Sequence, residues 1–94
     1  MTKVINKKSF TIAVPLYNEE AGLKQLKDKL EKTIHKNSEL VDIEVILVND
    51  GSTDNTNDLL IKYFRDEIYR IFNHEKNLNL GGFLNTAINN CKTE

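Results

Sequence analysis

The residues best placed for chemistry are polar side chains that follow two short apolar runs. Asp50 comes directly after the apolar run 43–48 and begins the segment DGSTD at positions 50–54. An earlier apolar run, residues 10–14, ends in a similar way in the segment PLYNEE at positions 15–20. Open α/β sheets bind ligands at the carboxyl ends of their strands. Two polar loops at the ends of two neighbouring strands therefore predict one shared ligand site.

Three other interpretations of the Asp50 segment compete with a ligand site. Asp-Gly favours a tight hairpin turn, but a helical pattern follows it where a hairpin needs a second strand. A calcium loop requires glycine at its sixth position and glutamate at its twelfth, where this chain has Asn55 and Ile61. A capping turn accounts for residues 52–54. It does not account for the carboxylate of Asp50, which precedes the cap.

Two further features lie near these loops. Tyr17 follows Pro15 in the first loop, and a planar ring beside a carboxylate suits a nucleobase pocket, although a ring that only covers the end of the sheet is the alternative. Gly81 and Gly82 precede a helical pattern, as glycines do in phosphate-binding loops. Neither standard glycine-rich phosphate motif is present, and a tight turn explains the pair equally well.

Composition excludes several classes of protein. The 94 residues carry 13 Lys+Arg and 14 Asp+Glu, a net charge of -1, so the basic excess of a nucleic-acid-binding protein is missing. Cys91 is the only cysteine, which rules out an internal disulfide and favours a reducing, cytoplasmic compartment. His35 and His74 lack a Cys or His partner at ligand spacing, and we interpret them as surface histidines. The segment Met1–Ser9 is polar and resembles neither a signal peptide nor a membrane span.

Hydrophobic periodicity predicts the elements that position these residues. Three apolar runs, 10–14, 43–48 and 69–72, are expected to be strands, the first two covered on both faces. Apolar residues recur at helical spacing over 19–36, 54–66 and 83–91. We expect Asn18 to cap the first helix, and Glu19 and Glu20 to place negative charge in its first turn. Residues 77–82 are expected to form a loop.

The element order β-α-β-α-β-α predicts an α/β fold. Right-handed crossovers give one parallel sheet of strand order 3-2-1 between helices, a three-layer, Rossmann-like half-domain. We expect residues 1–94 to form a single partial domain. In a complete doubly wound domain a fourth strand pairs with the free side of the strand over 10–14. An uncovered strand edge recruits another chain, so we expect this chain to self-associate.

Three motifs in this order resemble the amino-terminal signature of family 2 glycosyltransferases with the GT-A fold. They are VPLYNEE at 14–20, VNDGSTDNT at 48–56, and NLNLGG at 77–82 followed by Asn85. The resemblance covers residues 10–93 and implies a truncated GT-A fold whose partner is a nucleotide-sugar donor, with a UDP-sugar expected. It implies that the base and ribose are held by Pro15, Tyr17, Glu19 and Asp50, and that Gly81 and Gly82 close over the nucleotide. A carboxylate at Asp50 can accept the imide N–H of uracil.

The same resemblance implies parts that these 94 residues do not contain. Family members carry a D-x-D motif that binds Mg²⁺ or Mn²⁺ on the diphosphate, and a later acidic residue that acts as the catalytic base. We therefore expect an inverting transferase as the parent enzyme, with a polysaccharide, a lipid or another molecule as acceptor. This chain alone is expected to bind no metal, to carry no catalytic residue and to be inactive. Any membrane contact is expected through regions outside these residues.

Two other functions compete with a sugar transferase. A nucleotidyltransferase or related nucleotide-binding domain would need a glycine-rich, basic phosphate loop after the first strand, and the segment at 15–18 is a poor match for one. A non-catalytic nucleotide-binding or interaction module would keep the fold and lack the chemistry. A D-x-D motif in the continuing reading frame would favour the transferase.

Overall fold

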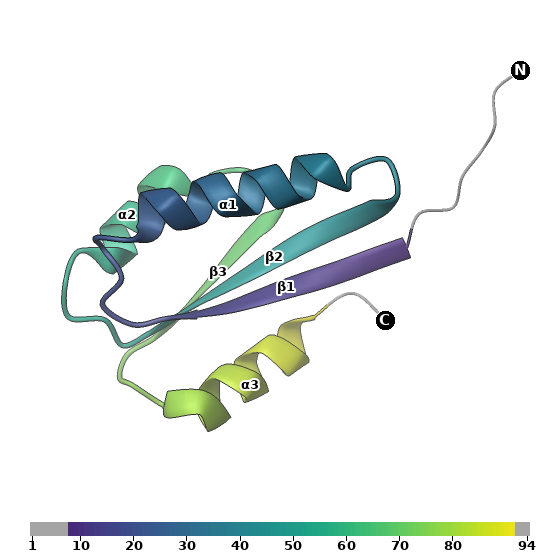
Figure 1. Ribbon diagram of the computed structural model, residues 1–94. Helices are drawn as coiled ribbons and strands as arrows, with labels where there is room; N and C mark the ends of the chain where they lie inside the picture. The colour runs from purple at the N-terminus through teal and green to yellow at the C-terminus, as the bar shows by residue number, and fades with distance from the viewer. Residues whose placement is uncertain (1–7, 92–94) are drawn as a thin grey trace, which may run out of the picture.

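Strands and helices alternate strictly along the chain (Figure 1). The computed structural model describes residues 8–91, so most of Met1–Ser9 and the last residues of the expected domain 1–94 lie outside the described residues. The elements are β1 (Lys8–Leu16), α1 (Leu23–Lys36), β2 (Val41–Asp50), α2 (Thr56–Tyr63), β3 (Tyr69–His74) and α3 (Asn79–Asn90). The predicted order β-α-β-α-β-α is confirmed.

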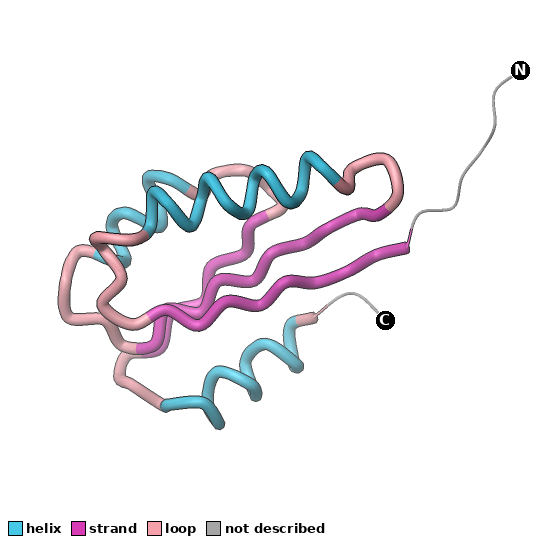
Figure 2. Tube along the Cα trace, in the orientation of Figure 1, coloured by secondary structure: helices cyan, strands magenta, loops and turns pink. Residues whose placement is uncertain are grey.

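The three strands form one parallel sheet in which β2 lies between β1 and β3. This is the predicted order 3-2-1 read from the other edge. Helices α1 and α2 cover one face and α3 covers the other, which confirms the three-layer arrangement (Figure 2). Because β2 is paired on both edges and covered on both faces, its residues 45–50 are buried.

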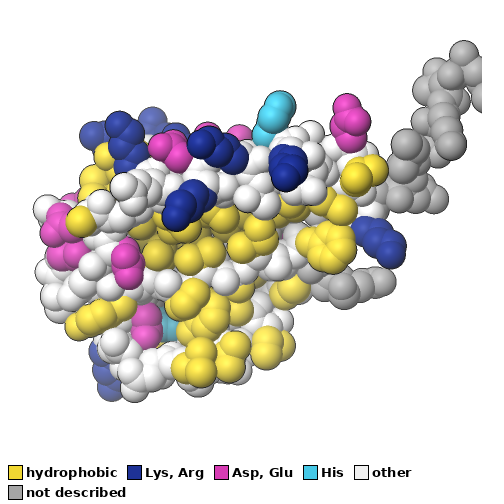
Figure 3. Space-filling view, viewed as in Figure 1, with side chains coloured by type: hydrophobic (Ala, Val, Ile, Leu, Met, Phe, Trp, Pro, Cys, Tyr) yellow, Lys and Arg dark blue, Asp and Glu magenta, His cyan; other side chains and the backbone are white. Residues whose placement is uncertain are grey.

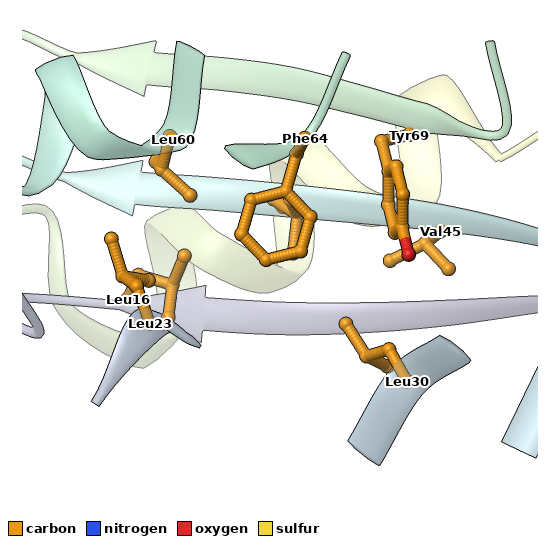
Figure 4. Close-up of a cluster of buried hydrophobic side chains, with 8 residues drawn as sticks. Leu16, Leu23, Leu30, Val45, Leu60, Phe64 and Tyr69 are labelled. Atoms are coloured by element: carbon orange, nitrogen blue, oxygen red, sulfur yellow. The ribbon is translucent and has the colours of Figure 1, made fainter. Parts of the chain in front are cut away.

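The alternation of side chains along the strands separates two hydrophobic cores. The larger lies under α1 and α2 and contains Leu16, Leu23, Leu30, Val45, Leu47, Leu60, Phe64 and Tyr69 (Figure 4). The smaller lies under α3 and contains Ile46, Val48, Phe83 and Ala87. Successive residues of a strand point to opposite faces. Asp50 therefore belongs to the face that α3 covers, and Asn49 to the face of α1.

The first helix begins later than the sequence predicts. It starts at Leu23 with Gly22 at its N-cap position, so Asn18 does not cap it, and no acidic residue lies in its first turn. Asn18 adopts φ 50°. The backbone N–H groups of residues 18–20 bond to side chains of the loop after β2 and of Thr56, the first residue of α2. These bonds hold the segment in a turn and delay the helix.

The third helix begins earlier than predicted, and the second is shorter. α3 starts at Asn79, so Gly81 and Gly82 lie in its first turn and not in a loop. The physical reason is the carboxylate of Asp50, which accepts the N–H groups of Leu78 and Asn79 and so caps the helix at that point. α2 spans only Thr56–Tyr63.

Arg70 fixes the other end of α3. One guanidinium nitrogen, Nη1, donates to Glu44 Oε1 at 2.8 Å and to the backbone oxygen of Asn90 at 2.5 Å. A cation at the last carbonyls of a helix is favoured by the helix dipole. Helix α3 is therefore held to the sheet by an acid at its start and a base at its end.

One edge of the sheet is open. Within residues 8–91, β1 pairs only with β2. Beside this strand a groove runs along α3, lined by Thr11, Ala13, Phe83, Leu84, Ala87, Ile88 and Cys91. Figure 3 shows hydrophobic side chains gathered along β1 and over α3, and Ile88 is 70% exposed.

Candidate functional site

The loop after β1 lies against the loop after β2 and is joined to it by hydrogen bonds. The backbone N–H of Asn18 donates to Ser52 Oγ at 2.9 Å, and that of Glu19 donates to Thr56 Oγ1 at 2.9 Å. In return, the N–H of Thr53 donates to Asn18 Oδ1 at 2.8 Å. The structure therefore brings together the two polar loops that the sequence places at neighbouring strand ends.

Asp54 stabilises this junction through bonds to both Thr56 and Glu20. Its Oδ1 accepts the backbone N–H of Thr56 at 2.9 Å and the Thr56 hydroxyl at 2.5 Å, and its Oδ2 accepts the N–H of Glu20 at 3.4 Å. Burial raises the pKa of Asp54, but the hydrogen bonds from Thr56 and Glu20 outweigh it and hold the pKa below its usual value. The capping role predicted for residues 52–54 fits Asp54, although Asn55 occupies the N-cap position of α2.

Asp50 ends β2 and is only 6% exposed. Its Oδ1 accepts the N–H of Leu78 at 2.8 Å and lies 2.7 Å from His74 Nδ1, while its Oδ2 accepts the N–H of Asn79 at 3.0 Å. Burial raises the pKa of Asp50, but the hydrogen bonds from Leu78, His74 and Asn79, with the charge of His74, outweigh it and lower the pKa below its usual value. Asp50 is therefore a carboxylate at neutral pH.

His74 is not the surface residue that its sequence context suggests. The parallel register pairs it with Asp50, and its side chain is only 10% exposed. Its Nε2 lies 2.7 Å from Thr86 Oγ1 in α3. His35, by contrast, is exposed near the end of α1, as predicted. The partner of His74 is a carboxylate on the neighbouring strand, which a search for Cys and His spacing does not detect.

A pocket of about 350 Å³ opens beside Asp50, between the loop after β1 and the start of α3. Its lining includes four residues of the predicted site, Pro15, Tyr17, Glu19 and Asp50, and adds Leu16, Asn77, Asn79, Leu80 and Phe83. Tyr17 lines this pocket and is 46% exposed. The sequence motif at 77–82 predicts its glycines as site residues, and not its asparagines, because glycine before a helix is the pattern of phosphate-binding loops.

Two glycines, Gly51 and Gly82, allow close approaches of the backbone around the site. Gly51 has φ +72°, and a Cβ there would overlap the backbone of Lys76 and Asn77. Gly51 therefore lets the loop before α3 approach the end of β2 and form one wall of the pocket. Gly81 and Gly82 are not among the pocket-lining residues. A Cβ on Gly82 would overlap the side chain of Leu78, so this glycine gives the start of α3 its room.

Two properties of the described residues bear on cofactors and membranes. Over residues 8–91, no cluster of three or more His, Cys, Asp or Glu side chains is arranged to hold a metal ion. The acceptor positions of Asp50 are largely taken by N–H donors, so this acid does not fit a Mg²⁺ or Mn²⁺ site.

The same part of the chain has no helix that is both long and apolar enough to cross a bilayer.

The chain is similar in sequence to a known protein family and to individual members of known function. Residues 11–94 match the sequence model of glycosyl transferase family 2. The chain is 36% identical over 81 residues to glycosyltransferase GlyA of Streptococcus pneumoniae, across 85% of this chain and 11% of that protein. It is 37% identical over 76 residues to the dolichyl-phosphate beta-glucosyltransferase ALG5C of Trichomonas vaginalis, across 76% of this chain and 22% of that protein. The chain thus aligns with only a small part of the length of these curated relatives.

Proposed function

Because the chain belongs to glycosyl transferase family 2, we propose that it forms the donor-recognition portion of a glycosyltransferase and that the pocket beside Asp50 binds the nucleotide of a nucleotide-sugar. The observation that carries the proposal is a buried carboxylate at the wall of a pocket that also contains an exposed aromatic ring, Tyr17. A nucleobase needs both a flat surface for stacking and a polar group at its edge. This pair of residues supplies them.

The acceptor positions of Asp50 favour uracil. A carboxylate offers about four of them, and the donors from His74, Leu78 and Asn79 take three. The position left on Oδ2 suits the imide N–H of uracil, in a charge-assisted hydrogen bond worth about 1.5–3 kcal/mol. Neutral cytosine carries an acceptor at the same ring nitrogen, so a UDP-sugar is the proposed donor.

The negative charge of the pocket indicates that only the base and ribose of the donor bind inside it. Within the described residues its lining contains no Lys or Arg, and it holds the acids Glu19 and Asp50. These charges repel a diphosphate, so the diphosphate and sugar are proposed to lie outside the pocket. We propose that Asn77 and Glu19, which both line the pocket, bond ribose hydroxyls. We also propose that Gly81 and Gly82, at the start of α3, close over the nucleotide when it binds. In the parent enzyme, Mg²⁺ or Mn²⁺ held by other residues would neutralise the leaving diphosphate.

The proposed reaction of the parent enzyme is an inverting transfer of a sugar to a polysaccharide, a lipid or another acceptor. The name of the dolichyl-phosphate relative supports a lipid phosphate among these. We place the enzyme in the cytoplasm or at the cytoplasmic face of a membrane. These 94 residues contain no D-x-D motif, and the later acid that serves as catalytic base in family members lies outside them, so we propose that this chain is inactive alone.

Calorimetric titration of UDP into the chain tests the proposal. Asp50→Asn is expected to weaken UDP binding about ten- to a hundredfold, and Tyr17→Ala at least fivefold, because base stacking is worth about 1–3 kcal/mol. Asp28→Asn, on the exposed side of α1, serves as the matched control and should bind like the unmodified chain. The unmodified chain should prefer UDP to CDP.

Two results would contradict the proposal. UDP affinity that is unchanged in a folded Asp50→Asn variant would remove Asp50 from the site. An unmodified chain that binds no nucleotide would favour a non-catalytic interaction module.

A further inference from the structure

A chain of hydrogen bonds runs from the pocket wall into α3 through His74. Nδ1 of this ring lies 2.7 Å from Asp50 Oδ1, and Nε2 lies 2.7 Å from Thr86 Oγ1. The ring is nearly buried, with its side chain 10% exposed. Neither His74 nor Thr86 is among the pocket-lining residues. Any effect of these two residues on a ligand in the pocket must therefore pass through Asp50 or through the position of α3.

We propose that His74 is a positioning residue for nucleotide recognition, anchored by Thr86, and that it fixes the orientation of the Asp50 carboxylate and so the direction of the acceptor position left for the base. The proposal rests on the proposed function of the pocket. The terminal torsion of an aspartate is broad and roughly two-fold, so the carboxylate needs an external constraint. His74 and Leu78 together occupy Oδ1, which leaves the spare acceptor position on Oδ2.

Thr86, like His74, does not line the pocket, and it lies one hydrogen bond further from Asp50 than His74 does. It lies in α3 one turn after Phe83, which lines the pocket and also packs against the sheet. With both ring nitrogens bonded, His74 cannot rotate without losing two hydrogen bonds, and its bond to Thr86 thereby fixes its bond to Asp50. Removal of the Thr86 hydroxyl should loosen the carboxylate while the pocket lining keeps its composition.

The test measures UDP and CDP affinity by calorimetry for two matched pairs of variants. Thr86→Val removes the hydroxyl at nearly constant volume, and Thr86→Ser keeps a hydroxyl. His74→Ala removes the ring, and His74→Asn keeps an amide donor near the position of Nδ1. We expect Thr86→Val and His74→Ala to weaken UDP binding about two- to tenfold, the net worth of one hydrogen bond. Thr86→Ser should remain within about twofold, and His74→Asn should restore part of the loss.

The preference for UDP over CDP separates positioning from general damage. A merely structural role would weaken both nucleotides equally, whereas a mobile carboxylate should lower the preference itself. In the His74→Ala background, Thr86→Val should add no further loss, because residues acting through one contact are not additive. Circular dichroism and urea midpoints check that each variant is folded. If His74→Ala does not fold, the Thr86 pair and His74→Asn carry the test.

The outcomes distinguish this inference from the proposed function. Unchanged UDP affinity and unchanged preference in folded Thr86→Val and His74→Ala, with a large loss in Asp50→Asn, would overturn the positioning role and leave the nucleotide pocket in place. If the unmodified chain binds no UDP, the proposed function fails and the positioning role fails with it. A loss of preference in Thr86→Val, restored in Thr86→Ser, would support both.

Discussion

Replacement of Asp50 is expected to destabilise the chain as well as the pocket. Asp50→Ala removes the acceptor for the N–H groups of Leu78 and Asn79 at the start of α3, and it also removes the partner of His74. Loss of a helix cap costs about 0.5–2 kcal/mol, and loss of a hydrogen bond to a charged group costs about 1.5–3 kcal/mol. We expect a total loss of about 2–5 kcal/mol in the free energy of unfolding. A chain of this size has only about 5–14 kcal/mol in all.

Urea denaturation followed by far-UV circular dichroism measures this loss. Asp50→Asn keeps one acceptor oxygen and should lose about half as much as Asp50→Ala. Asp28→Asn, exposed on α1, is the control and should stay within about 0.5 kcal/mol of the unmodified chain. Amide hydrogen exchange should accelerate first in the opening turn of α3. A loss below about 0.5 kcal/mol for Asp50→Ala, with unchanged exchange in α3, would refute the capping role.

Three further predictions concern pH, the core and the open sheet edge. The folded pKa of Asp50 lies below its unfolded value of about 3.9, so the stability that its ionised form contributes is complete above that value and is lost as the pH falls through the folded pKa. Below about pH 4, Asp50→Asn should therefore lose less stability than the unmodified chain. Equal losses in the two proteins would contradict this. Tyr69→Phe should leave stability unchanged or raise it by up to about 1 kcal/mol, because Tyr69 Oη is buried without a hydrogen-bond partner over residues 8–91, and a clear loss in urea denaturation would argue against this. The chain should self-associate at micromolar concentration in sedimentation experiments, since β1 leaves an edge open beside an apolar groove; Ile88→Lys should reduce the association, and a monomeric unmodified chain would count against it.

Local patterns were sufficient to predict the strands, their order and the two loops at their ends. The apolar run of β2 indicated a strand covered on both faces, and its residues 45–50 are buried. Of residues 52–54, which the sequence predicts to cap α2, Asp54 accepts the N–H of Thr56 in the first turn, while Asn55 occupies the N-cap position. The motif around Asp50 led to a pocket that four of the six predicted site residues line.

Contacts between distant residues explain what the sequence did not predict. Helix α1 begins later than the sequence predicts because Asn18 bonds to a loop more than thirty residues away. The sequence predicts His74 as a surface residue because only the strand register places it beside Asp50. The carboxylate of Asp50 also caps α3 at Asn79, so the helix begins earlier than the sequence predicts and includes Gly81. Helix termini and buried polar pairs depend on tertiary partners, which periodicity does not contain.

Amide NMR spectra of the isotope-labelled chain, recorded during a UDP titration, test the central claim most directly. The pocket at the carboxyl ends of the strands predicts that the shifted amides belong to Tyr17, Glu19 and residues 77–80. A second pocket at the opposite end of the sheet, lined by Ser9, Asp42, Ile43, Glu44, Glu67, Ile68 and Arg70, provides an internal comparison. Shifts confined to that end, or no shifts at millimolar UDP, would contradict a nucleotide site beside Asp50.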